Sequence, residues 1–318
     1  MKPTSLHPAK PKARSFVSFP AHIADELHRY DTYLRDVQGL AAETRKSRSR
    51  VVSLFLQEKF KRCAIDIRKL RTDDIRQFLS EYSTGGSASH SAHLAVALRS
   101  YLRYRTICGD QSSKLTAVIL NPVHWRLASL PRALKPEEID RLLEVVASAR
   151  RWPKRGYAIV RLALDMGLRS GEIAHLMISD VDWRTGTVTL RGTKSLRQDV
   201  LPLPMETGQA LADYLQYERP VTSQTAIFVR RVAEQDRPIT SVAIQKVIKR
   251  ACCCIGLPHY SAHALRHTLA CRLVESGSSL KEVADLLRHR SLNTTLIYAK
   301  LDTPRLSTVA LPWPGSQS

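Results

Sequence analysis

A break in the apolar pattern divides this chain of 318 residues into two parts with different periodicities. Residues 109–133 lack a clear period and contain Gly109, Pro122 and Pro131, residue types that interrupt regular structure. Helical patterns alone precede the break, whereas helical and strand patterns are mixed after it. A chain of this length also gives a soft prior for two domains. The sequence therefore predicts a mainly α N-terminal domain at 15–108, a linker at 109–133 and a mixed α+β C-terminal domain at 134–304.

The N-terminal part has the apolar spacing of a small helical domain. Apolar side chains recur at i, i+4, i+7 and i+11 in its first stretch, namely Ile23, Leu27, Tyr30 and Leu34. Further helices are expected at about 41–59, 72–82 and 88–107. Residues 1–14 are rich in Pro, Lys and Ser, so we expect a flexible tail there.

The C-terminal part mixes helices with one predicted hairpin. Pro136 fits the first turn of a helix, and residues 156–178 form a helical pattern around a short turn at Gly167. Residues 187–190 and 199–203 have strand character, with Lys194 in or beside the turn between them. The other expected helices cover 205–217, 240–254, 262–276, 279–288 and 292–300, followed by a C-terminal tail at 305–318.

The charge balance points to a polyanionic partner. Lys and Arg number 49 against 29 Asp and Glu, which gives a formal net charge of +20. Such an excess most often accompanies nucleic-acid binding. The alternative is a generally basic protein from a high-GC genome.

Two other classes of protein are disfavoured. No apolar run approaches the roughly 20 residues of a membrane span, and the N-terminus lacks the apolar core of a signal peptide. The six cysteines, three of them adjacent at 252–254, fit neither a disulfide framework nor a paired zinc-ligand spacing. We therefore expect a cytoplasmic protein with reduced thiols and no membrane partner.

The last third of the chain carries an ordered set of His, Arg, His and Tyr. The segments are His263-Ala264-Leu265-Arg266-His267, then Leu286-Leu287-Arg288-His289, then Tyr298. Upstream, Gly167-Leu168-Arg169-Ser170-Gly171-Glu172 and Gly192-Thr193-Lys194 add a second arginine and a lysine. Attack on a phosphodiester needs positioning, cations on the phosphoryl oxygens and a proton for the leaving oxygen. The set predicts a tyrosine hydroxyl as nucleophile, with arginines that hold the phosphate.

Each of these residues also has an ordinary structural interpretation. Arg169 is compatible with a surface position at a helix end, and His263 with a cap or a core position. Tyr298 is one of ten tyrosines, most of which should be packing residues. His267 is turned by about 100° from Arg266 on a helix, so we expect a structural role for it. Arg288 and Arg290 could each contact a phosphate or lie on a solvated face, and both are left out of the predicted catalytic set.

Taken together, the segments resemble the tyrosine recombinase (phage integrase) family, closely over about residues 134–301. The resemblance implies Arg169 and Arg266 as catalytic arginines, with Glu172 able to orient the first. It implies His263 and His289 as phosphate ligands, Tyr298 as nucleophile and Lys194 as general acid in a mobile hairpin turn. The N-terminal part resembles the family's helical core-binding (SAM-like) domain in size, helicity and position.

The family implies a two-domain clamp on double-stranded DNA that cuts and rejoins strands through a 3′-phosphotyrosine, without metal or cofactor. Four protomers, identical or with related recombinases, are expected on paired sites, with the 305–318 tail docked on a neighbour. The tail gives a weak hint of a mobile-element recombinase. Integration, transposition and resolution stay open as tasks. The alternatives are type IB topoisomerase-like relaxation and a catalytically idle DNA-binding protein on the same fold.

Overall fold

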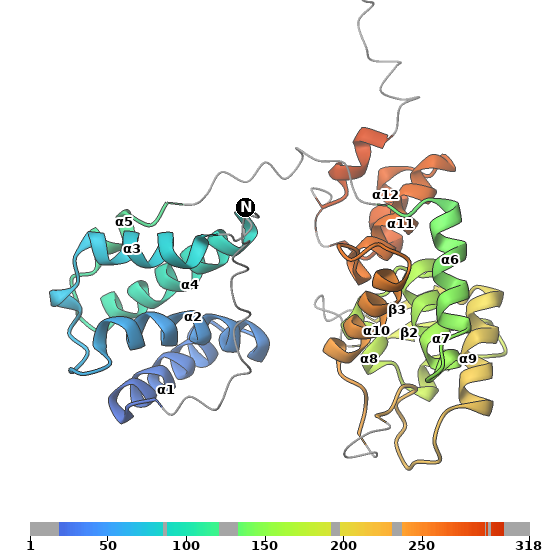
Figure 1. Cartoon of the computed structure of the whole chain (residues 1–318), viewed down its shortest axis with the longest axis horizontal. Coiled ribbons are helices and arrows are strands. Elements are labelled where there is room, and N and C mark those ends of the chain that lie inside the picture. The colour runs from blue at the N-terminus through green and yellow to red at the C-terminus, as the bar shows by residue number, and fades with distance from the viewer. Residues whose placement is uncertain are drawn as a thin grey trace, which may run out of the picture. The chain divides into compact units, whose positions relative to one another are not determined.

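In the computed structural model the chain divides into two compact units, Met1–Trp125 and Arg126–Ser318 (Figure 1). The structure describes residues 19–84, 88–120, 133–191, 198–230, 237–289, 291 and 294–301. The first unit is helical, and the second combines helices with a small sheet. None of the helices in these ranges is long and apolar enough to cross a membrane.

The N-terminal unit is built on four helices and a short fifth. They are α1 (Ala21–Asp36), α2 (Ala42–Phe60), α3 (Thr72–Ser83), α4 (Ala88–Ile107) and α5 (Ser113–Ala117), with a 3₁₀ turn η1 (Ile67–Lys69) between α2 and α3. α4 contacts α1, α2, α3 and α5. Its buried residues Leu98, Tyr101 and Leu102 meet Tyr30 of α1 and Phe55 of α2 in one apolar core. The predicted helical positions of this unit are found within a residue or two.

One part of the predicted linker is wrong. Residues 113–117 form α5, and Leu115 and Ile119 are buried in the core of the N-terminal unit. The Ser112 hydroxyl donates to the carbonyl of Leu102 on α4 at 2.7 Å and fixes the start of α5. A helix of five residues is too short to show a period in the sequence, which explains why the segment had the pattern of a connection.

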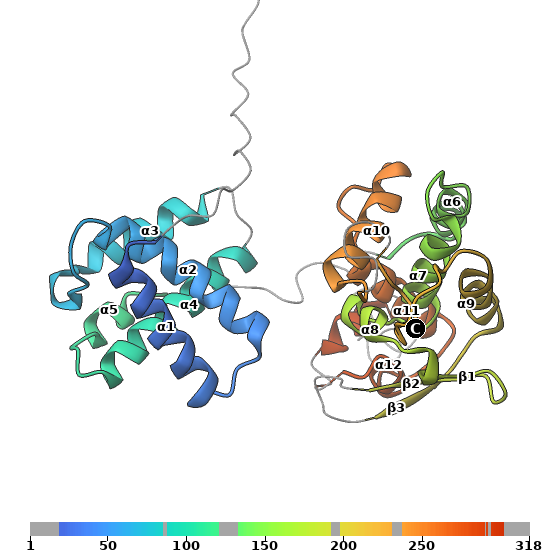
Figure 2. The same ribbon diagram turned by 90° about the horizontal axis from the view of Figure 1, so that it is seen from below.

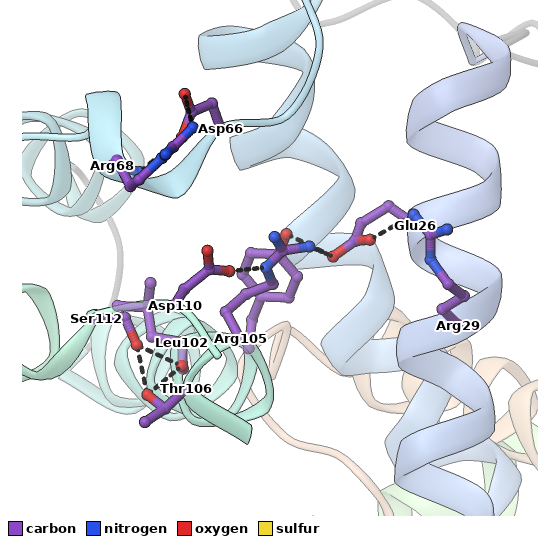
Figure 3. Close-up of polar contacts among 10 residues, drawn as sticks. Glu26, Arg29, Asp66, Arg68, Leu102, Arg105, Thr106, Asp110 and Ser112 are labelled. Atoms are coloured by element: carbon purple, nitrogen blue, oxygen red, sulfur yellow. Dashed lines mark hydrogen bonds and ion pairs between the residues drawn. The ribbon is translucent and has the colours of Figure 1, made fainter. Parts of the chain in front are cut away.

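A buried carboxylate joins α1 to α4 in the N-terminal unit (Figure 3). Glu26 on α1 is fully buried and accepts from the Tyr101 hydroxyl at 2.9 Å and from Arg105 at 2.8 Å. Arg105 also pairs with Asp110 at 2.6 Å, and Arg29 reaches Glu26 at 3.0 Å. Burial disfavours the charge of Glu26, but Arg105, Arg29 and the Tyr101 hydroxyl together outweigh burial and hold the pKa of the carboxyl below its usual value.

Replacing Glu26 with glutamine is expected to destabilise the N-terminal unit on the order of 3 kcal/mol at pH 7, because Arg105 loses a buried counterion. Since the folded pKa is lowered, the contribution of Glu26 is present above about pH 4.5 and lost below it. The free energies of unfolding of the wild type and of Glu26→Gln, measured with urea, should therefore converge as the pH falls below that value. Asp73→Asn, which breaks an exposed pair with Arg76, is the control and should change stability by less than about 1 kcal/mol. Equal losses of unfolding free energy in Glu26→Gln and Asp73→Asn would contradict this account.

The C-terminal unit packs its helices around α7. The helices are α6 (Pro136–Ala147), α7 (Pro153–Asp165), α8 (Ser170–His175), α9 (Met205–Tyr217), α10 (Ser241–Cys254), α11 (Ala262–Glu275) and α12 (Leu280–Leu286), with 3₁₀ turns η2 (Ile178–Asp180) and η4 (Leu296–Leu301). α7 contacts α6, α8, α9, α10 and α11. Its residues Ala158–Leu164 are all buried, as expected for a helix enclosed by others.

An antiparallel sheet of three strands covers one side of this unit (Figure 2). Its strands are β1 (Val181–Asp182), β2 (Thr187–Leu190) and β3 (Asp199–Pro202), in the order β1-β2-β3. Val188 lies opposite Leu201, and both are buried, whereas Val200 is exposed. The predicted hairpin is present, but β1 was not expected because two residues carry no alternation. The connection 192–197, with Lys194, lies outside the described residues.

The turn predicted at Gly167 is present and separates α7 from α8. α7 ends at Asp165, and Gly167 takes a left-handed φ of 59°. A Cβ at this position would lie 2.7 Å from Leu287 and 3.0 Å from Leu269, so only glycine allows this close approach. The turn brings the start of α8 against α11 and the end of α12, where the candidate site lies.

Candidate active site

Helix α11 presents three predicted or neighbouring polar residues close to its N-terminus. His263, Arg266 and His267 occupy positions i, i+3 and i+4, which share one side of a helix. His263 is exposed, His267 is half-buried and Arg266 is 5% exposed. Leu265, on the opposite side of α11, is fully buried in the apolar core, which fixes the direction of the polar side chains.

The guanidinium of Arg266 is held by two backbone carbonyls. Its Nη1 donates to the carbonyl of Gly167 and its Nη2 to the carbonyl of Leu287. These carbonyls come from the α7–α8 turn and from the residue that follows α12. A single side chain therefore ties three segments of the C-terminal unit together.

Arg169 lies immediately before α8 and is oriented by the acid of the same turn. The Glu172 carboxylate accepts from the backbone N–H of Arg169 and from its Nη1, both at 2.8 Å. Arg169 Nη2 also reaches the carbonyl of Arg288 at 3.3 Å. The Arg169 side chain remains 38% exposed, so part of its guanidinium can meet a ligand. The predicted orienting role of Glu172 agrees with these contacts.

His289 and Tyr298 follow α12 and lie on opposite sides of a short connection. His289 Nδ1 and the Thr295 hydroxyl are 2.8 Å apart. Tyr298 lies on η4 and is 1% exposed, packed with Leu269, Cys271 and other apolar residues of α11 and α12. In the part of the predicted helix at 292–300 that the structure describes, the 3₁₀ turn η4 covers Leu296–Leu301.

The hydroxyl of Tyr298 contacts His267, which was expected to be structural only. Its oxygen lies 2.5 Å from His267 Nδ1, and the two ring centroids are 5.6 Å apart. The expected structural role of His267 stays a prediction, but rotation from Arg266 alone gave no indication of this partner, because it does not decide where η4 lies. The spacing i+4 from His263 was the signal for a shared side of the helix.

The cationic and imidazole groups form one electrostatic unit. Although His263 is exposed as a residue, the surrounding protein partly desolvates its ring and lowers its pKa, and Arg266 and Arg169 lower it further. Burial lowers the pKa of His289 to about 4, with Arg266 and Arg169 as further causes. Burial, Arg169 and Arg288 also lower the pKa of the Arg266 guanidinium. Each shift reflects burial first and neighbouring positive charge second. An anion placed here is therefore attracted by the arginines and can receive N–H bonds from neutral imidazoles.

Tyr298 is protected as a neutral phenol in this arrangement. Burial raises the pKa of the Tyr298 hydroxyl above its usual value, with Cys271 as the next cause. An unprotonated His267 Nδ1 can accept the hydroxyl proton, and burial lowers the pKa of His267 as well. The structure thus brings together five of the six predicted site residues, and the sixth, Lys194, lies outside the described residues.

His267→Phe is expected to destabilise the protein by about 1–3 kcal/mol, because the buried Tyr298 hydroxyl loses its partner. His267→Gln, which retains an acceptor, is the matched variant and should lose less. In a double-mutant cycle with Tyr298→Phe, urea unfolding should give a coupling energy of about 1 kcal/mol. Strictly additive losses would mean that the two side chains do not interact.

Comparison with known proteins agrees with this geometry. Residues 132–305 match the Phage integrase family. A putative integrase/recombinase of Sinorhizobium fredii, y4rA, is 33% identical over 298 residues, which cover 93% of this chain and 72% of that protein. Tyrosine recombinase XerA of Thermococcus kodakarensis is 30% identical over 291 residues, which cover 91% of this chain and 94% of that protein.

Solved structures show the same fold. A lambda integrase dimer bound to a COC′ core site superposes with a TM-score of 0.66 at 17% identity, over 92% of this chain and 98% of that chain. The XerH recombinase bound to its difH substrate before cleavage superposes with a TM-score of 0.66 at 22% identity, over 90% of this chain and 82% of that chain. Since the family match spans more than half of the sequence and the relatives cover most of the rest, the chain belongs to the phage integrase family as a tyrosine recombinase.

Proposed function

We propose that this protein is a site-specific DNA recombinase that cleaves one strand with Tyr298 and rejoins it to a partner strand. The proposal rests on one observation, which is that Tyr298 packs against α11, the helix that holds Arg266. The Tyr298 hydroxyl is hydrogen-bonded to His267, the immediate neighbour of Arg266. The nucleophile and the phosphate-binding groups therefore belong to one packed structure.

The reaction follows from these groups. The Tyr298 oxygen attacks phosphorus as its proton passes to a neutral imidazole such as that of His267, and the bond from phosphorus to the 5′-oxygen breaks. Lys194 donates a proton to that oxygen, which gives a 3′-phosphotyrosine and a free 5′-hydroxyl. Attack of a 5′-hydroxyl from a partner site on the phosphotyrosine reverses the bond changes and joins the new strands.

The other residues stabilise charge on the phosphoryl group. Arg169 and Arg266 remain charged and each offers planar donors to non-bridging oxygens. His263 and His289 are neutral near pH 7, since their pKa values are lowered, and donate N–H bonds. Donors that are already oriented require little reorganisation as charge develops, which is the main source of this kind of stabilisation.

The described arrangement corresponds to a resting state. Tyr298 is 1% exposed, so a DNA phosphate cannot reach its hydroxyl unless η4 moves. His289 Nδ1 and the Thr295 hydroxyl are in contact in the segment between α12 and η4. When η4 moves, this contact either moves with it or breaks. Binding of the DNA site supplies the free energy for this rearrangement, which keeps the nucleophile covered away from DNA.

Double-stranded DNA is the proposed partner of both units. The net charge of +20 and the relatives bound to DNA support this assignment. A lambda integrase tetramer has been solved on a Holliday junction. By analogy, we propose that four copies, or copies with related recombinases, assemble on two sites, with the N-terminal unit as the second arm of a clamp and the 305–318 tail docked on a neighbour.

The test uses duplexes that cover the DNA flanking the encoding gene, first for binding and then with a nick placed beside the bound site. A nick lets the short 5′ fragment diffuse away and traps the covalent adduct. A four-way junction from two labelled sites is the result expected of a recombinase. Adducts and relaxation without junctions would indicate topoisomerase-like action, and binding without adducts an idle DNA-binding protein.

Lys194→Ala is expected to lose cleavage by about 10²–10⁴-fold on normal DNA, the range for removal of a general acid. Replacing the bridging 5′-oxygen by sulfur makes a better leaving group and should restore cleavage in this variant. Arg266→Ala is the control and should not be restored. Equal responses of the two variants to sulfur would make Lys194 a DNA-positioning residue.

A further inference from the structure

The end of helix α12 holds three arginines through three successive carbonyls. The carbonyl of Leu286 accepts from Arg288 Nη1 at 3.0 Å, that of Leu287 from Arg266 Nη2, and that of Arg288 from Arg169 Nη2. The last carbonyls of a helix have no partner within it and lie at the negative end of its dipole. They are therefore suited to bind guanidinium groups, and here they orient both proposed catalytic arginines.

Arg288 is the member of this group to which neither the sequence nor the proposed reaction gives a task. It has a left-handed φ of 53°, which is unfavourable for a residue with a Cβ. Its side chain is only 6% exposed and donates from Nη2 to Glu172 at 2.9 Å. A buried charge on a residue with an unfavourable backbone conformation requires a compensating interaction. The Glu172 carboxylate provides it.

Glu172 is therefore shared between two cations. Its Oε1 accepts from Arg169, and its Oε2 accepts from Arg288 and from the backbone of Arg169. One negative charge against two positive charges leaves a net charge of about +1 at this corner. If Glu172 paired with Arg169 alone, the two charges would cancel, and Arg169 would attract a phosphate less strongly.

We propose that Arg288 is a positioning residue that shares the Glu172 carboxylate, so that Arg169 is oriented by this acid without being neutralised by it. Arg288 does not touch the phosphate and acts through Glu172 and through its own carbonyl on Arg169. This inference rests on the proposed function, in which Arg169 binds the scissile phosphate.

The first test compares variants of the full-length protein on the nicked site. Arg288→Gly removes the cation while glycine accepts the left-handed φ without strain. Single-turnover cleavage should fall about 10-fold to 100-fold, the size expected for a lost hydrogen bond to a charged group, while DNA affinity stays close to that of the wild type. Arg288→Lys keeps the charge and should lose less. Arg272→Gln, on an exposed position of α11, removes one charge elsewhere and should cleave normally.

The decisive variant combines Arg288→Gly with Glu172→Gln. The amide oxygen of glutamine can still accept from Arg169, and the corner regains a charge of about +1. Cleavage should recover about 10-fold over Arg288→Gly alone, an effect that a purely structural role of Arg288 would not produce. A double variant no faster than Arg288→Gly, or an Arg288→Gly protein that cleaves normally, overturns the inference alone. A wild-type protein that forms no adduct overturns the proposed function and the inference with it.

Discussion

The Tyr298→Phe protein is expected to form no covalent adduct with DNA, while its affinity for the site stays close to that of the wild type. The substitution removes one oxygen and keeps the ring among Leu269, Cys271 and their neighbours. No other group in the proposed reaction can form the bond to phosphorus, so the loss should be complete within detection. Gel separation of labelled nicked substrate under denaturing conditions measures it.

Tyr214→Phe is the matched control, because Tyr214 is another fully buried tyrosine of the C-terminal unit. It should form adduct at a rate near that of the wild type. Melting temperatures of both variants report whether a lost hydroxyl disturbs the fold. An adduct trapped with Tyr298→Phe would show that another residue is the nucleophile.

Substitution of Arg266 should give the second largest effect. Arg266→Ala and Arg266→Lys are each expected to slow cleavage by about 10²–10³-fold or more, as when a transition-state donor is removed. Lysine keeps a charge but cannot bridge the carbonyls of Gly167 and Leu287 while it binds a phosphate. The assay is single-turnover cleavage beside a binding titration.

The alanine variant should also lose stability, by about 1–3 kcal/mol, since two buried carbonyls lose their donor. Unfolding curves separate this loss from the chemical effect, and Arg272→Gln on the same helix controls for the removal of a charge. If Arg266→Lys cleaves at nearly the wild-type rate, Arg266 is a structural tie between segments and not a phosphate ligand.

Helix positions could be predicted from the sequence where a helix buries one side over several turns. α2, α4 and α9 begin and end close to the predicted residues because their apolar spacing extends over their length. α5 and β1 were missed because five and two residues carry too little pattern. The turn between α7 and α8 was predicted at Gly167, but the close approach of Leu287 to this glycine was not, because that contact joins residues that are distant in the sequence.

The candidate site could be predicted at the positions that the family's motif spacing identifies. The structure brings five of these residues together, namely Arg169, His263, Arg266, His289 and Tyr298. The roles of His267 and Arg288 could not be inferred in the same way. His267 acquires its partner from η4, and Arg288 acquires its partner from α8. Such contacts depend on how the segments pack. The assignment of Lys194 stays a prediction.

The most direct test of the central claim is identification of the residue that is joined to DNA. The wild-type adduct on nicked substrate is digested with trypsin and nuclease, and the modified peptide is sequenced by mass spectrometry. The account predicts a nucleotide on the tryptic peptide Ser291–Lys300, whose one tyrosine is Tyr298. A nucleotide on any other residue, or no linked peptide from protein that has cut its site, would contradict it.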